Sequence, residues 1–333
     1  MIAYVANAGS RDISVLELNQ RDGTIRLIEN VPAAGEVMHL AIGPGQKYLY
    51  ASLTSEPYSV SSWGIASDTG KLRTIQTIPA ADNMAYLFVD RSGRYLLGAS
   101  YFGDKISVNA VGARGELSPK PQFVISTGKH PHCIVTDPSN TFVFVPTLGA
   151  DAILQYRFAE ANGELTPNSP PAIATKKDAG PRHLVFHPDR HRAFCTNELD
   201  GTVNMYDITG SGTLTMLGSF SLMPAGLKKK PWAADIHVSP DGQFLYASER
   251  SSSTIAAFRI NGGTLTLIGH YPTETQPRGF TIDPDGKYLL AVGEASNSLS
   301  TYEIDGRTGA LRQRARVNVG QGPNWIEVIA WPR

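Results

Sequence analysis

The chain has 333 residues, of which 41% are hydrophobic and 18% are charged. This length allows two ordinary domains or one large all-β domain, and the composition excludes an intrinsically disordered chain. Lysine plus arginine and aspartate plus glutamate both number 30. The chain therefore lacks the basic excess of a nucleic-acid-binding or membrane-surface protein, and we expect neither kind of partner.

The sequence opens with a strand-like run, Met1–Ala6, and no basic segment with a long apolar stretch precedes it. We therefore expect no signal peptide, and no apolar run approaches the 18 residues of a membrane span. The cytoplasm is the expected location. Two cysteines in a chain of this length, Cys133 and Cys195, are expected to be reduced and buried rather than part of a disulfide framework.

The first part of the chain predicts three strands, Ile2–Asn7, Asp12–Leu18 and Ile25–Glu29. A Gly-x-(Leu/Ile) signal then recurs throughout the sequence at intervals of 45 to 51 residues. The seven copies begin at Gly23, Gly70, Gly115, Gly163, Gly212, Gly263 and Gly309. A second signal accompanies it, in which an apolar run leads into a polar turn, usually with proline, and then into an aromatic-rich strand.

The unit near the C-terminus shows the repeat most clearly. Two strands, Gly279–Asp283 and Tyr288–Val292, flank a Pro-Asp-Gly turn, and a third follows at Leu299–Ile304. The Gly309 hairpin then opens a fourth strand. Four strands in a period of about 45–50 residues are typical of a β-propeller blade, and neither a β-sandwich nor two barrels needs seven near-equal repeats. The sequence predicts an all-β, seven-bladed β-propeller.

The two ends of the chain predict how the ring closes. The N-terminal part supplies three strands with no first strand before them, and the C-terminal part supplies one strand, Trp325–Ala330. We expect these four strands to form a composite seventh blade, which leaves no open edge between the first and last blades. One domain spanning residues 1–333 follows from this arrangement.

The repeat also predicts where a site would lie. Loops that enter the innermost strands of a propeller converge near the axis, so equivalent positions should surround one point. Counting back six residues from the proline of each turn, or from Arg91 in the unit without one, gives Met38, Ala85, His132, Arg182, Ala234 and Arg278, with Asn324 as the equivalent in the closing blade. The loops after the second strands add Asn197, Glu198, Glu249, Arg250 and Glu294. A histidine, two guanidiniums and a carboxylate can converge there.

Each polar residue also has a purely structural interpretation. Arg182 and Arg278 can form ion pairs between blades with Glu198 and Glu249, and His132 can be a hydrogen-bonded core histidine. His130 and His132 stand at i, i+2, but a metal pair without a third ligand at a defined spacing is a weak signal. No metal site is predicted.

A basic run, Lys228–Lys230, precedes Trp232 and the segment that contains Asp235 and His237. Three consecutive lysines are usually a solvated loop. This run can also attract an anionic substrate to the same face of the propeller.

Five stretches together resemble the seven-bladed propeller lactonases. They are Ala-Gly-Pro-Arg-His-Leu-Val-Phe-His-Pro (179–188), Asn-Glu-Leu (197–199), Trp-Ala-Ala-Asp-Ile-His (232–237), Thr-Gln-Pro-Arg-Gly-Phe (275–280) and Val-Gly-Gln-Gly-Pro (319–323). That family holds the bacterial cycloisomerase-2-type 6-phosphogluconolactonases, to which the likeness is closest, and a fungal muconate lactonizing enzyme. The resemblance covers the whole chain and places the family's catalytic residues on His132, Arg182, Glu198 and Arg278, although the extra His130 departs from the family pattern.

The resemblance implies hydrolysis of 6-phospho-D-glucono-1,5-lactone to 6-phosphogluconate, a step of the pentose phosphate pathway. Glu198 or His132 would be the general base, one arginine would stabilise the oxyanion and the other would hold the phosphate. The expected partner is therefore a small anionic sugar lactone, and the strained lactone ring needs no metal or cofactor. Two alternatives stay open: a reaction of another lactone, including muconate cycloisomerisation, and a propeller without catalytic activity that binds other proteins.

Other polar residues near these positions are expected to contact substrate. They are His183, Asn197, Asp235, His237 and Asn324.

Overall fold

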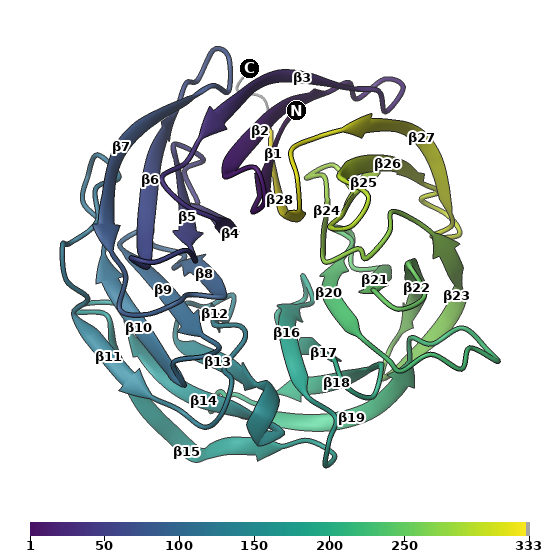
Figure 1. Cartoon of the computed structure of the whole chain (residues 1–333). Helices are drawn as coiled ribbons and strands as arrows, with labels where there is room; N and C mark the ends of the chain where they lie inside the picture. The colour runs from purple at the N-terminus through teal and green to yellow at the C-terminus, as the bar shows by residue number, and fades with distance from the viewer. Residues whose placement is uncertain (331–333) are drawn as a thin grey trace.

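The computed structural model describes residues 1–330, which form seven four-stranded antiparallel sheets arranged as blades around one axis (Figure 1). The prediction of an all-β, seven-bladed propeller is confirmed. A single turn of 3₁₀ helix, η1 (Leu148–Ala150), is the only helical element in this part of the chain. No helix within it is long and apolar enough to span a membrane.

We number the blades in the chain order of their innermost strands, and name the strands of each from the axis outward. Blade 1 contains β4 (Val37–Ile42), β5 (Tyr48–Leu53), β6 (Ser59–Ile65) and β7 (Leu72–Pro79). Blade 2 contains β8 (Tyr86–Val89), β9 (Tyr95–Ser100), β10 (Lys105–Ala110) and β11 (Phe123–Ser126). Blade 3 contains β12 (Val135–Thr136), β13 (Phe142–Thr147), β14 (Ala152–Ala159) and β15 (Glu164–Ala174).

The remaining blades follow the same order. Blade 4 contains β16 (Pro181–Phe186), β17 (Arg192–Asn197), β18 (Thr202–Ile208) and β19 (Leu214–Ser221). Blade 5 contains β20 (Ala233–Val238), β21 (Phe244–Glu249), β22 (Thr254–Asn261) and β23 (Thr264–Pro272). Blade 6 contains β24 (Gly279–Ile282), β25 (Tyr288–Gly293), β26 (Ser298–Ile304) and β27 (Leu311–Asn318). Blade 7 contains β28 (Pro323–Ile329), β1 (Ile2–Asn7), β2 (Asp12–Leu18) and β3 (Ile25–Pro32).

Blade 7 joins the two ends of the chain in one sheet, as the sequence predicts. Its strands lie in the order β28-β1-β2-β3, and Ile2 is the register partner of Ile329. The last three residues of the predicted domain, 331–333, lie outside the described part. Because β28 is hydrogen-bonded to β1, the ring is closed by backbone pairing as well as by side-chain packing.

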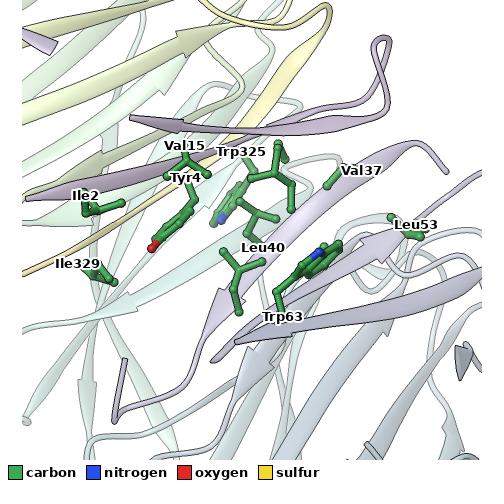
Figure 2. Close-up of a cluster of buried hydrophobic side chains, with 13 residues drawn as sticks. Ile2, Tyr4, Val15, Val37, Leu40, Leu53, Trp63, Trp325 and Ile329 are labelled. Atoms are coloured by element: carbon green, nitrogen blue, oxygen red, sulfur yellow. The ribbon is translucent and has the colours of Figure 1, made fainter. Parts of the chain in front are cut away.

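The hydrophobic core is divided into seven clusters, each enclosed by two neighbouring blades. Figure 2 shows the cluster where the ring closes, in which Tyr4 and Trp325 of blade 7 meet Leu40 and Trp63 of blade 1. Apolar burial is the main stabilising term in folding, so each blade depends on both of its neighbours. Both cysteines are free and buried in the cluster between blades 3 and 4, in agreement with the prediction.

Two physical constraints explain why glycine recurs in these hairpins, and both are clearest at Gly212. Its φ of +73° is in the region that favours glycine, and an added Cβ would lie 2.1 Å from the ring of Phe142 in the preceding blade. Gly309 is similar, since its Cβ would lie 2.4 Å from Phe244. Each hairpin therefore receives a large side chain from its neighbour. Gly263, in blade 5, is the exception, because nothing lies within 4 Å of its Cβ position. The preceding blade begins its second strand with Arg192, where blade 3 has Phe142.

Replacing Gly212 with alanine is expected to lower the free energy of unfolding by about 2–4 kcal/mol, from left-handed strain and from overpacking against Phe142. Gly263→Ala is the matched control, and its effect should stay within about 0.5 kcal/mol, as for a surface change. Denaturant titration of both variants measures the difference. Equal losses would show that the contact with the neighbouring blade does not explain the repeat.

Candidate active site

A pocket of about 420 Å³ lies on one face of the propeller and is lined by residues of six blades. The lining residues are Glu36, Met38, Thr54, Asn83, Ala85, Tyr101, Phe102, His132, Glu198, Trp232, Arg250 and Arg278. A pocket of this size lies within the range of about 300–1,000 Å³ typical of small-molecule sites. Its walls come from loops, while the strands behind those loops hold them in place.

Two sets of repeat-equivalent residues account for most of this lining. The position that precedes the turn by six residues contributes Met38, Ala85, His132 and Arg278. The position directly after the second strand contributes Thr54, Tyr101, Glu198 and Arg250. The repeat thus builds one concave site from residues that are far apart in the sequence.

Glu198, on the pocket wall, is held by two arginines. Its Oε2 lies 2.8 Å from Nε of Arg182 and accepts a hydrogen bond of 2.7 Å from Nη2 of Arg250. The N–H of Arg182 Nε is not aligned for a hydrogen bond, so that contact is an ion pair. Burial opposes ionisation of Glu198, but Arg182 and Arg250 outweigh it and hold its pKa below the ordinary value. Oε1 has no hydrogen-bond partner among the described residues and is available to the pocket.

Arg182 does not line the pocket but lies behind Glu198, with its side chain 1% exposed. Burial, and then the charge of Arg278, lower its pKa to about 10. The predicted alternative of an ion pair with Glu198 is therefore realised, although within blade 4 rather than between blades. The pair between blades is Arg250–Glu198.

Arg250 was not among the predicted catalytic residues. Its guanidinium stacks on the ring of Trp232 at 3.9 Å, and burial, followed by the charge of Arg182, lowers its pKa to about 9. Because Arg250 stands at the same repeat position in blade 5 as Glu198 in blade 4, the repeat itself contains the signal that identifies it.

Arg278 differs from the other two arginines, because no salt bridge to it is found within residues 1–330. Its one side-chain contact of hydrogen-bond type is Nη2 to Sδ of Met38, at 3.5 Å. The alternative in which Arg278 pairs with Glu249 is wrong, since Glu249 accepts instead from the backbone N–H groups of Trp232 and Ser252. Arg278 therefore presents a guanidinium to the pocket without a carboxylate beside it.

His132 lines the pocket and is kept neutral. Burial, reinforced by the charge of Arg182, holds its pKa well below the ordinary value, and its Nδ1 is buried without a hydrogen-bond partner. The neighbouring His130 is turned away, with its ring stacked on Tyr101 at 4.3 Å and Nδ1 donating to the Tyr101 carbonyl. Of the two histidines, His132 is the one that the structure brings to the pocket.

The structure does not bring the five other predicted substrate contacts to the pocket wall. Asn197 donates to Thr202 within blade 4, and Asn324 donates to the Val37 carbonyl of blade 1. The remaining three, His183, Asp235 and His237, form a hydrogen-bonded cluster behind Arg182. Direct contact of these five residues with substrate stays a prediction.

The site carries an excess of positive charge. Arg182, Arg250 and Arg278 approach one another closely enough to depress the pKa of the first two, while Glu198 is the carboxylate that two of them share. The exposed lysine run is tied to the same wall, because Lys229 donates to the Ser251 carbonyl beside Arg250. Like charges that converge on a pocket are stabilised when an anion binds between them.

Comparison with known proteins agrees with this geometry. A family model described as "Lactonase, 7-bladed beta-propeller" matches residues 1–328. The chain belongs to the seven-bladed β-propeller lactonase family. It is 39% identical to the 6-phosphogluconolactonase of Pectobacterium atrosepticum over 99% of this chain and 98% of that protein, and 35% identical to the 6-phosphogluconolactonase of Yersinia pestis over 98% and 97%.

Among solved structures, this propeller lactonase is similar to the periplasmic gluconolactonase of Pseudomonas aeruginosa. The two are 28% identical, with a TM-score of 0.93 and 99% of each chain covered. The resemblance inferred from sequence motifs is therefore confirmed for the family. The catalytic roles of His132, Arg182, Glu198 and Arg278 within the lactonase site stay predictions.

Proposed function

We propose that this enzyme hydrolyses 6-phospho-D-glucono-1,5-lactone to 6-phosphogluconate. The observation that carries the proposal is the positive charge at the pocket. Arg250 and Arg278 line it, and Arg182 lies directly behind its wall. Arg182 and Arg250 share a single carboxylate, that of Glu198. Such a site favours a substrate that brings its own negative charge and develops more during the reaction. The relatives named 6-phosphogluconolactonase, at 35% and 39% identity over nearly the whole chain, support this choice of substrate.

The first step is attack of water on the lactone carbonyl carbon. Glu198 accepts one proton from that water through Oε1, and a C–O bond forms as the carbonyl π electrons move to oxygen. Once Glu198 is protonated, it no longer neutralises Arg182 and Arg250. Their charge then becomes available to the oxyanion as it forms, so these interactions are stronger in the transition state than in the ground state.

The second step is collapse of the tetrahedral intermediate. The oxyanion re-forms the carbonyl, the bond from that carbon to the ring oxygen breaks, and the ring oxygen takes back the proton held by Glu198. The product is an open-chain acid that loses its carboxyl proton to solvent at neutral pH. His132, neutral and on the pocket wall, orients the lactone by a hydrogen bond and is the alternative general base.

Arg278 is the proposed ligand of the substrate phosphate. It lines the pocket without a carboxylate partner, and its planar fork can bind two phosphate oxygens at once. The lysines at 228–230, exposed near the same wall, draw the anion toward the pocket by long-range attraction.

Replacing Arg278 with lysine is expected to lower kcat/KM for the phosphorylated lactone at least tenfold, equivalent to about 1.4 kcal/mol, because lysine loses the bidentate fork. The same change should affect unphosphorylated gluconolactone much less. Kinetic assays on both substrates, corrected for spontaneous hydrolysis, measure the difference.

Arg182→Lys is the matched control, since Arg182 contacts Glu198 rather than the pocket. It should also lower kcat/KM at least about tenfold, but by equal factors for the two substrates. If Arg278→Lys also lowers kcat/KM by equal factors for the two substrates, neither arginine binds the phosphate. That result would favour an unphosphorylated lactone as the natural substrate.

That second candidate has a specific observation in its favour, because the structural neighbour at a TM-score of 0.93 is a gluconolactonase. Wild-type kcat/KM on phosphorylated and unphosphorylated aldonolactones and on a muconolactone ranks the candidates. Absence of turnover on every lactone would favour the non-catalytic alternative. For location we propose the cytoplasm, because a phosphorylated sugar acid does not cross a membrane unaided.

A further inference from the structure

Three buried side chains behind the pocket are in direct contact. Nδ1 of His183 lies 2.8 Å from Oδ1 of Asp235. Nη1 of Arg182 lies 3.1 Å from Nε2 and 3.4 Å from Nδ1 of His183, which places the guanidinium against the face of the imidazole ring. The side chains of Arg182, His183 and Asp235 are 1%, 4% and 3% exposed, so solvent has little access to them. On its other side, Arg182 contacts Glu198.

The carboxylate of Asp235 determines where the proton of His183 sits. An ionised carboxylate can only accept a hydrogen bond. The neutral imidazole must therefore carry its proton on Nδ1, directed at Asp235, and leave Nε2 unprotonated. Burial, followed by the charge of Arg182, lowers the pKa of His183 to about 3, so the ring is neutral. Burial disfavours ionisation of Asp235, but His237 and His183 reverse this and lower its pKa.

We propose that Asp235 is a positioning residue, which fixes the tautomer and the orientation of the His183 ring. The guanidinium of Arg182, which rests on that ring, is thereby held against Glu198. The proposal rests on the proposed function, because it assigns Arg182 to the charge that the reaction uses. A ring nitrogen that is fixed by a hydrogen bond at its other nitrogen is a general device for orienting histidine. Here the oriented group is the arginine beyond it.

Ser248 supplies an internal control, because it holds Asp235 by the backbone rather than by the carboxylate. The N–H of Asp235 donates to Oγ of Ser248 at 2.9 Å. The carboxylate is held separately, by His183 on Oδ1 and by the backbone N–H of Phe280 on Oδ2. Loss of the Ser248 hydroxyl thus disturbs Asp235 without touching the bond to His183. A purely structural role of Asp235 predicts similar effects from Ser248 and His183, whereas the positioning role does not.

The first experiment is spectroscopic and does not depend on any substrate. Protein labelled with ¹⁵N-histidine gives distinct nitrogen shifts for the two tautomers, and the signals of His183 are assigned by their loss in His183→Phe. We expect the Nδ1-protonated tautomer in the wild type and its loss in Asp235→Asn, because an amide nitrogen can donate to Nδ1. A wild-type His183 protonated on Nε2 would overturn the proposal.

The second experiment is kinetic. Asp235→Asn and His183→Phe should each lower kcat about 10–100-fold with a smaller change in KM, while Ser248→Ala should stay within about threefold of wild type. The double variant of Asp235 and His183 should be no slower than His183→Phe alone, since the first residue acts through the second. Additive losses, or equal losses for Ser248→Ala, would contradict the positioning role.

The two experiments separate this proposal from the proposed function. If the expected tautomer is found but no lactone is turned over, the proposed function is wrong and the contact between Asp235 and His183 stands. If Asp235→Asn does not fold, the wild-type tautomer and the comparison of His183→Phe with Ser248→Ala still decide the question.

Discussion

Replacing Glu198 with glutamine is expected to lower turnover of 6-phosphogluconolactone about 10²–10⁴-fold, the range expected for loss of a general base. Glutamine keeps the size of the side chain but cannot accept the proton of the attacking water. It also leaves Arg182 and Arg250 without the carboxylate that they share. Steady-state kinetics at a temperature well below the melting transition of the variant measure the loss.

Folding must be followed in parallel, because removing one partner of a buried ion pair destabilises a protein. Glu294→Gln is the matched control, since Glu294 stands directly after the second strand of blade 6, as Glu198 does in blade 4, but does not line the pocket. Its turnover should equal that of the wild type. Wild-type turnover in Glu198→Gln, together with an inactive His132→Ala, would identify His132 as the base.

Deleting residues 325–333 is expected to abolish cooperative folding. The deletion removes most of β28, the innermost strand of blade 7, and leaves the hydrogen-bonding edge of β1 unpaired. It also removes Trp325 and Ile329 from the cluster between blades 7 and 1 (Figure 2). Circular dichroism during heating, with size-exclusion chromatography, should show aggregated protein without a sharp transition.

Deletion of residues 331–333 alone is the control, because it leaves β28 whole. A variant without residues 325–333 that stays soluble and melts cooperatively would contradict the role of β28 in closing the ring.

The fold could be predicted from the sequence because the constraints repeat. Six of the seven hairpin glycines adopt a positive φ and receive a neighbouring side chain, as Gly212 receives Phe142, so the same residue recurs at nearly the same interval. The composite blade followed from counting strands, and its strand order agrees with the structure. Both inferences depend on local sequence alone.

The site was predicted less completely, because spacing gives a position but not the direction of a side chain. The pairing of β16 with β17 shifts register between Pro181 and Leu184. This irregularity interrupts the alternation of side chains and leaves both Arg182 and His183 buried near the axis, one behind Glu198 and the other behind Arg182. Spacing alone could not show that Arg182 lies behind the wall while Arg278 lies on it.

Arg250 was missed as a catalytic candidate for a different reason. Its importance comes from two contacts across the fold, with Glu198 of blade 4 and with the ring of Trp232. Neither Glu198 nor Trp232 is close to Arg250 in sequence. The sequence of one repeat does not predict which of its polar residues will form an ion pair with a neighbouring blade.

The pairing of Ile2 with Ile329 makes the order of the blades independent of where the polypeptide starts. A short linker can connect these two strand ends across blade 7, and new termini can be opened between Gly262 and Gly263, where a Cβ would meet nothing within 4 Å. Such a circular permutant would begin in the middle of blade 5. Blade 5, instead of blade 7, would then combine strands from the two ends of the chain. Because the pocket is lined by residues from six blades, the same lactonase site would be assembled although the blades follow one another in a different order along the chain.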